Sequence, residues 1–208
     1  LPSAGRDKEE TVERKSCFHE DPILLHVPQN TAVELMCQSD KAEVSIQRTH
    51  KSPKHFEPKL MKGEDLLCGS ELRGAGLMNE ASTRIVRTFL DRSNCPETNF
   101  FIGEVVSYPG KWSSFPPHTH VEPEIYFYKF LPENGYGYAE VGDTVYKVHH
   151  NDATCMAHGV DSQPGYRPRV CGVLYLAIRL RDNDPMVTTV VPEHAWVAEK
   201  DAKYFPEI

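Results

Sequence analysis

Two histidines and a glutamate, His118, His120 and Glu124, form an H-x-H-x3-E pattern that is suited to holding a metal ion. Side chains at positions i and i+2 of a strand point to one face, so both imidazoles could bind one cation. Pro123 then interrupts the strand, and Glu124 opens the next one. Two imidazoles and one carboxylate suit Zn, Fe, Mn, Ni or Co. The pattern therefore predicts a divalent metal site.

Aromatic side chains follow on the face of Glu124, because Tyr126, Tyr128 and Phe130 keep its alternation. Phenols beside a metal can bind a polyhydroxylated ligand or assist proton transfer, but they could equally be aromatic packing of a barrel. The adjacent His149 and His150 would face opposite ways on a strand. The other histidines, His19, His26, His50, His55 and His194, are isolated and are expected to be structural or exposed.

The composition is that of a folded domain with an acidic surface: 208 residues, 39% apolar, 25% charged and a net charge of -7. A nucleic-acid-binding protein would need a basic stripe, so we exclude that class. Neither a run of about 18 apolar residues nor an apolar N-terminal signal occurs, which predicts a cytoplasmic protein without a membrane span. The six cysteines show no C-x-x-C pair, so we expect reduced, mostly buried thiols rather than disulfides. A structural zinc site made from these cysteines is the least favoured alternative.

The elements expected to position these residues are short β-strands separated by turns, and 16 prolines disfavour a helical protein. The predicted strands are 23–27, 32–36, 44–47, 83–90, 100–106, 124–131, 136–141, 144–148, 153–156, 170–178 and 187–191. Two of them, IYFYKFL and VCGVLYLAI, are apolar on both faces, which indicates walls between packed layers. Residues 49–82 look like a boundary or long connection, with one short helix near 63–67.

The segment GKWSSFPPHTH followed by PEIYFYKF resembles the metal motif of the cupin superfamily, and within it that of the 5-deoxyglucuronate isomerases of myo-inositol catabolism. Further similar stretches are LPENGYGY, PEHAW at 192–196, STRIVRTFL at 82–90 and DPILLHVPQNTAVELMCQSDKAEVSI upstream. The 4-deoxy-5-hexosulose-uronate ketol-isomerases form a related branch. The resemblance implies an all-β, cupin-type double-stranded β-helix, a jelly-roll barrel, at 83–208. It also implies an incomplete second cupin half at 1–50 and a connecting segment at 51–82.

A fourth metal ligand is implied by the same resemblance. Members place a histidine before a Pro-Gly-Tyr turn, and HGVDSQPGY at 158–166 fits that place, with His158 as the matching residue. Asp161 is the alternative ligand if the turn is shifted. An incomplete N-terminal half would expose sheet edges and apolar surface, so we expect a homo-oligomer.

The implied activity is a metal-dependent aldose–ketose isomerisation of a deoxy sugar acid, 5-deoxyglucuronate to 2-deoxy-5-keto-gluconate. The expected metal ligands, with zinc as the first choice, are His118, His120, Glu124 and His158. Tyr126 or Tyr128 would assist proton transfer, and Arg84 or Arg87 would pair with the substrate carboxylate. Lys129 lies on the opposite strand face from Glu124. Two other functions stay open: a non-haem Fe(II) oxygenase and a non-catalytic, sugar-binding cupin.

Overall fold

Strands dominate the computed structural model, which describes residues 8–49, 55–157, 171–181, 186–199 and 201–204, and the backbone alone of 162–166. The helical turns are short: η1 (Gly63–Asp65), η2 (Met78–Glu80) and η3 (Pro192–Ala198). Within these residues, no helix has both the length and the apolar character needed to cross a membrane.

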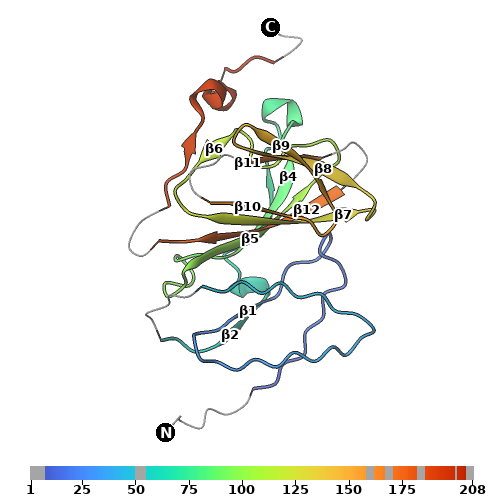
Figure 1. Cartoon of the computed structure of the whole chain (residues 1–208), viewed down its shortest axis with the longest axis vertical. Coiled ribbons are helices and arrows are strands. Elements are labelled where there is room, and N and C mark those ends of the chain that lie inside the picture. Colours follow the sequence, from blue (N-terminus) through green and yellow to red (C-terminus); the bar gives the residue numbers. More distant parts are fainter. Residues whose placement is uncertain are drawn as a thin grey trace.

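A six-stranded antiparallel sheet forms the middle of the molecule (Figure 1). In spatial order its strands are β10 (Ala153–Met156), β7 (Glu124–Leu131), β12 (Cys171–Arg179), β5 (Phe100–Ser107), β4 (Arg84–Leu90) and β3 (Cys68–Arg73). One face of this sheet, the inner face, is covered by β11 (Ser162–Tyr166), β8 (Tyr136–Val141) and β9 (Thr144–His149), and by the pair β13 (Thr189–Val190) and β6 (His118–Thr119). Two sheets enclosing one interior form a jelly-roll barrel.

The barrel interior is filled by alternate residues of the strands. Tyr126, Tyr128 and Phe130 of β7 are almost fully buried, as their shared face predicts. They pack with Val86, Val105, Leu174, Ala139 and Val148. The all-β jelly-roll prediction is confirmed, and β7, β8 and β10 have the predicted bounds.

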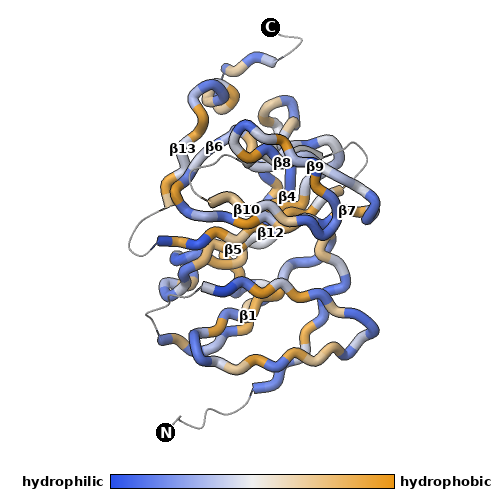
Figure 2. Tube along the Cα trace, in the orientation of Figure 1, coloured by the Kyte–Doolittle hydropathy of each residue, from blue (hydrophilic) through white to orange (hydrophobic). Residues whose placement is uncertain are grey.

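The other, outer face of the six-stranded sheet packs against the N-terminal segment, residues 8–49 (Figure 1). Here β1 (Leu24–His26) pairs with β2 (Lys59–Met61). A second core includes Met61, Leu66, Phe89, Cys95 and Ile102. Figure 2 shows hydrophobic stretches along both this segment and the sheet that it faces.

Two strand predictions are wrong, those at 32–36 and 44–47. Leu35, Met36 and Ile46 are 59%, 76% and 63% exposed, and no described strand pairs with either stretch. A strand needs a hydrogen-bonded neighbour, which β-type residues alone do not supply. Conversely, β3 was missed because it is a mostly exposed polar edge strand, and it lies within the segment expected to be a connection. The helix expected near 63–67 is the single turn η1.

The cysteine prediction is correct in one respect and wrong in another. All six cysteines are free, as expected, but Cys95 is the one that is buried, and Cys37 and Cys155 are exposed. Cys155 alternates with the buried Met156 on β10, so it points away from the core. Whether a thiol is buried therefore depends on its place in the fold rather than on its residue type.

Candidate functional site

The H-x-H segment is only partly a strand, because β6 ends at Thr119 and pairs with two residues of β13. The His118 and His120 rings lie 6.4 Å apart between centroids. The Nδ1 atom of His118 is 3.0 Å from the carbonyl oxygen of Pro116. A carbonyl only accepts hydrogen bonds, so Nδ1 is the donor and Nε2 of the neutral ring keeps its lone pair. A histidine fixed in this way is oriented as metal-binding histidines are.

His120 lies between two carboxylates. Its Nε2 atom is 3.1 Å from Oε2 of Glu124, and its Nδ1 atom is 3.6 Å from Oε2 of Glu122. The hydrogen bond with Glu124 raises the pKa of His120 against the opposing effect of burial. Both glutamates are buried, Glu122 to 2% exposure and Glu124 to 5%.

Glu122 is the residue that sequence analysis missed. Both of its carboxylate oxygens are buried without a hydrogen-bond partner, and so is Nδ1 of His120. Burying a carboxylate without a hydrogen bond is costly, and its contact with His120 at 3.6 Å is an ion pair only when the imidazole is protonated. Glu122 is therefore a candidate for binding a cation or a ligand. The signal available in the sequence was the E-P-E spacing, which places a second acidic residue just before β7.

The donor set fits a divalent metal ion. Two imidazoles and two carboxylates offer nitrogen and oxygen donors, and the carboxylates would balance a charge of +2. His118, His120 and Glu124 do not bring their ligating atoms within 4.8 Å of one another, so their side chains would have to rotate to share one ion. His158 and Asp161, the predicted fourth ligand and its alternative, lie outside the described residues.

The two candidate phenols have different surroundings. The Tyr126 hydroxyl is 3.1 Å from Oγ of Ser114, a residue that takes a left-handed conformation with φ of 56°. Burial, followed by the charge of Glu124, raises the pKa of Tyr126 well above its usual value. The Tyr128 hydroxyl lies 2.8 Å from Oγ1 of Thr154 on β10. Tyr126 is thus the phenol beside the acidic groups.

The two candidate arginines lie on opposite faces of β4. Arg84 alternates with Val86 on the inner face, donates to Oγ of Ser82 at 2.9 Å, and lies close enough to Tyr126 for the phenol to influence its pKa. Burial, the first cause, and the charge of Arg73 lower the pKa of Arg84. Arg87 instead points to the outer face and makes a buried ion pair with Glu104 at 2.6 Å. The structure therefore brings only Arg84 toward the predicted phenols.

Lys129 and the adjacent histidines also lie away from the candidate site. Lys129 is on the outer face, as predicted, and pairs with Glu43 of the N-terminal segment at 2.7 Å. His149 is exposed, whereas Nδ1 of His150 accepts from the backbone N–H of Phe130. A hollow between β9 and β10 is lined by Tyr146, Lys147, Asp152 and Cys155 among others, and by none of the candidate site residues.

Fold and side chains together define a jelly-roll protein whose interior carries phenols and an arginine, with two histidines and two buried glutamates close by. Comparison of the sequence with known protein families identifies the family within this class. The chain matches the KduI/IolB family over residues 3–197 and therefore belongs to that family.

Relatives with established names agree with the family. A 5-deoxy-glucuronate isomerase of Geobacillus thermodenitrificans is 25% identical over 198 residues, which cover 86% of this chain and 66% of that protein. The enzyme of the same name from Bacillus subtilis strain 168 is 32% identical over 135 residues, covering 62% of this chain and 47% of the relative. The chain thus spans about two thirds or less of these relatives.

A solved structure supports the fold. The crystal structure of an IolB-like protein from Salmonella typhimurium LT2 superposes with a TM-score of 0.62 at 22% identity, covering 70% of this chain and 58% of that one. This similarity extends the agreement from sequence to architecture.

Proposed function

We propose that this protein is a metal-dependent aldose–ketose isomerase of a deoxy sugar acid, with 5-deoxyglucuronate as substrate and 2-deoxy-5-keto-gluconate as product. Family membership supports the reaction class, and the relatives named 5-deoxy-glucuronate isomerase support the substrate. In this reaction a proton moves from one carbon to the adjacent carbonyl carbon. The aldehyde oxygen gains a proton and becomes a hydroxyl, while the neighbouring hydroxyl loses its proton and becomes the ketone.

His118, His120, Glu122 and Glu124 would hold the metal, with His158 as the further ligand that the family resemblance implies. A bound divalent ion supplies Lewis-acid polarisation of a carbonyl oxygen. The two carboxylates would balance its charge, and the neutral imidazoles would add none. This matters because an uncompensated charge in this buried region would be costly. Zinc is the first choice, and manganese, iron, nickel and cobalt accept the same donors.

Tyr126 is the better candidate of the two phenols for contact with the reacting oxygen. Its raised pKa keeps the hydroxyl protonated, so it acts as a hydrogen-bond donor rather than as a base. A neutral donor aimed at an oxygen that gains negative charge stabilises the transition state more than the ground state. The hydroxyl of Ser114 holds the phenol in place.

Arg84 would bind the carboxylate of the sugar acid. A protein with a net charge of -7 repels an anionic substrate, so its binding site needs local positive charge. Arg84 is on the inner face, and its Nη1 is fixed by Ser82, whereas Arg87 is already committed to Glu104. A planar guanidinium also matches a carboxylate in two parallel hydrogen bonds.

The observation that carries this proposal is the buried Glu122 carboxylate without a hydrogen-bond partner beside His120 and Glu124. The test is conversion of 5-deoxyglucuronate by protein that has been stripped of metal and reloaded with one ion at a time. We expect turnover with zinc or another first-row divalent ion, and none in the stripped protein. Failure of every such ion to restore turnover would contradict the proposal.

Oxygen consumption with the same preparation separates the isomerase from an Fe(II) oxygenase. An isomerase consumes no oxygen during turnover, because its substrate and product are isomers. Uptake of oxygen in proportion to product would favour the oxygenase.

A further inference from the structure

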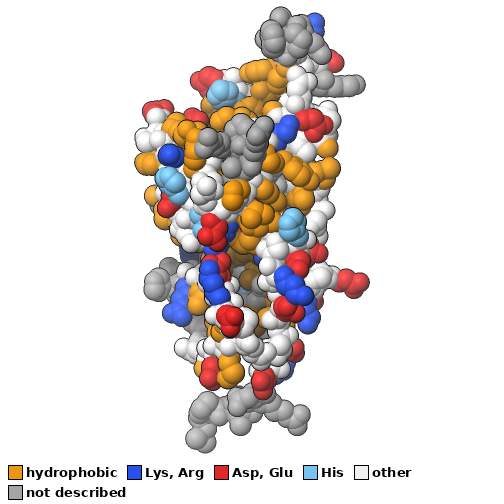
Figure 3. Space-filling model, turned by 90° about the vertical axis from the view of Figure 1, so that its right-hand side faces the viewer, with side chains coloured by type: hydrophobic (Ala, Val, Ile, Leu, Met, Phe, Trp, Pro, Cys, Tyr) orange, Lys and Arg blue, Asp and Glu red, His pale blue; other side chains and the backbone are white. Residues whose placement is uncertain are grey.

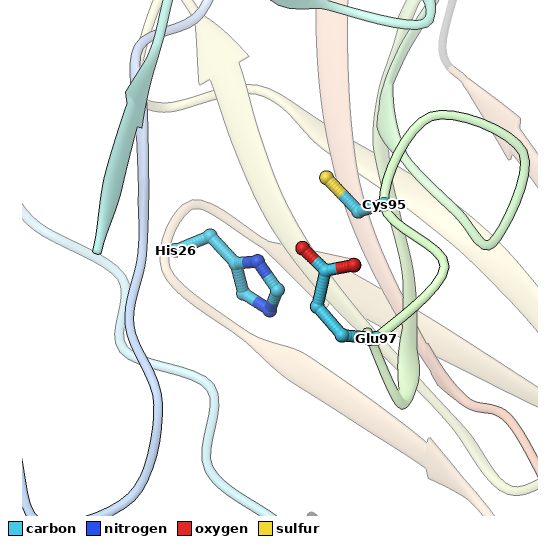
Figure 4. A group of neighbouring side chains, drawn as sticks. All are labelled: His26, Cys95 and Glu97. Atoms are coloured by element: carbon cyan, nitrogen blue, oxygen red, sulfur yellow. The ribbon is translucent and has the colours of Figure 1, made fainter. Parts of the chain in front are cut away.

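A second group of metal-ligating side chains lies on the outer side of the six-stranded sheet, apart from the candidate active site. His26 comes from β1, whereas Cys95 and Glu97 come from the loop between β4 and β5. Their ligating atoms lie within 4.8 Å of one another, and Figure 4 shows the three side chains pointing toward a common point. Among the residues that the structure describes, this is the one set of three that approaches so closely.

Each part of this group is held by its own surroundings. The His26 ring stacks on Phe56 at 4.3 Å between centroids. The loop is fixed by backbone hydrogen bonds from Cys95 to Asp91 and from Thr98 to Cys95, both 2.9 Å. The Nδ2 atom of Asn94 also donates to the carbonyls of Asp65 and Phe89. The three donors are therefore positioned before any ligand arrives, which lowers the entropy cost of binding.

The donor types select the ion. A thiol, an imidazole and a carboxylate are a mixed S, N and O set, which suits Zn²⁺ and disfavours Mg²⁺ and Ca²⁺. Sulfur and nitrogen ligands of a tetrahedral zinc lie about 3.5 Å apart. The group would therefore close by roughly 1 Å, and the half-buried Glu97 side chain has room to rotate. A water molecule would complete the four positions.

The surroundings of the group do not activate the thiol as they would in a catalytic pair. Burial and then Glu97 raise the pKa of Cys95, and burial lowers the pKa of His26. Thiol and imidazole thus stay neutral, which is the opposite of an activated Cys–His pair. On binding Zn²⁺ the thiol would lose its proton, and thiolate and carboxylate would balance the ion. The neighbouring Lys59 does not compete with a metal ion for the Glu97 carboxylate, because its ammonium group pairs with Asp65 at 2.9 Å.

We propose that His26, Cys95 and Glu97 form a second, structural site for Zn²⁺ or a similar thiophilic divalent ion. By linking β1 to the β4–β5 loop, the ion would fasten the N-terminal segment to the barrel. This site is independent of the isomerase reaction, because it lies on the other side of the six-stranded sheet from the candidate active site. Its sulfur donor, which His118, His120, Glu122 and Glu124 lack, distinguishes the two sites in a titration.

The test is titration of the metal-free 208-residue chain with Co²⁺ alone. A thiolate bound to Co²⁺ gives a charge-transfer absorption in the near ultraviolet, which nitrogen and oxygen donors do not give. We expect this absorption to appear in the wild-type chain, to saturate at one ion per chain in His118→Ala, where the first site is disabled, and to disappear in Cys95→Ser. Cys155→Ser is the matched control, because that thiol is exposed and should leave the absorption unchanged.

Two further variants keep the test decisive if Cys95→Ser fails to fold. His26→Gln and Glu97→Gln should each weaken Co²⁺ binding at the thiolate site by about tenfold or more. Zn²⁺ should also raise the melting temperature of His118→Ala, and it should raise that of the double variant His118→Ala/His26→Gln much less. Absence of the absorption in the wild-type chain, or its survival in Cys95→Ser, would overturn the proposal.

Discussion

The two faces of the six-stranded sheet bury charged groups in different ways. On the outer face, Glu104 accepts hydrogen bonds from Arg87 at 2.6 Å and from Arg14 of the N-terminal segment at 3.1 Å. At the inner face, Glu122 has no hydrogen-bond partner. On the side of the molecule drawn in Figure 3, hydrophobic side chains gather mainly in the upper half, and charged side chains of both signs lie around and below them.

This difference distinguishes buried charged groups that hold the fold together, such as Glu104, from buried carboxylates that are available to bind a ligand, such as Glu122. Although burial acts to lower the pKa of Arg14, its hydrogen bond with Glu104 raises it. Arg87 also donates to the carbonyls of Cys17 and Phe18, so the group attaches the N-terminal segment to the sheet. The carboxylates near His120 make no comparable attachment, and they retain the capacity to bind a cation.

The largest expected effect is on the inner face, from Glu124→Gln. Loss of this carboxylate should remove the ion of the inner site, one per chain, and lower kcat/KM by about 1000-fold or more, because polarisation of the carbonyl is lost. The melting temperature of the metal-free protein should change little, since the barrel is held by its aromatic core. Elemental analysis measures the metal content, steady-state kinetics measures kcat/KM, and thermal unfolding measures the melting temperature. Unfolding without metal loss would make Glu124 structural.

The matching change on the outer face is Glu104→Gln. Arg14 would then keep its charge without a counter-ion, and Arg87 would keep only the half-exposed Asp21 at 3.6 Å, so the free energy of unfolding should fall by about 3 kcal/mol. For a chain of this length the melting temperature should fall by about 10 °C. The exposed Glu13→Gln is the control and should leave it unchanged. If metal content fell with stability, the two faces would not be independent.

The alternation of strand residues was enough to predict much of this arrangement. It placed Tyr126, Tyr128 and Phe130 on the face of Glu124 and Lys129 on the opposite face, because strand geometry repeats every two residues. The structure shows that the first of these faces is the interior. Alternation also puts Arg84 and Arg87 on opposite faces of a strand, but it could not tell which of them faces the interior. The role of Arg87 depends on Glu104 and on the distant Cys17 and Phe18. The pairing of His26 with Cys95 and Glu97 is likewise a long-range contact that no local pattern encodes.

A smaller effect should distinguish the two phenols. Tyr126→Phe removes a donor to the reacting oxygen and should lower kcat by about 100-fold, with metal content unchanged. Tyr128→Phe removes only the hydrogen bond to Thr154, which should lower stability by about 1 kcal/mol and leave kcat near the wild-type value. Equal loss of kcat in both variants would show that the surroundings of Tyr126 confer no special role.

The smallest expected effect concerns the cost of keeping a carboxylate unpaired. In the metal-free protein at alkaline pH, where His120 has lost its proton, Glu122→Gln removes a buried charge and should raise the free energy of unfolding by about 1 kcal/mol. The same substitution should weaken metal binding, because one oxygen donor loses its charge. Denaturant unfolding measures the first effect, and metal titration measures the second. A destabilised variant would mean that Glu122 is held by contacts of the folded barrel, as Glu104 is on the outer face, and that the two faces bury charge alike.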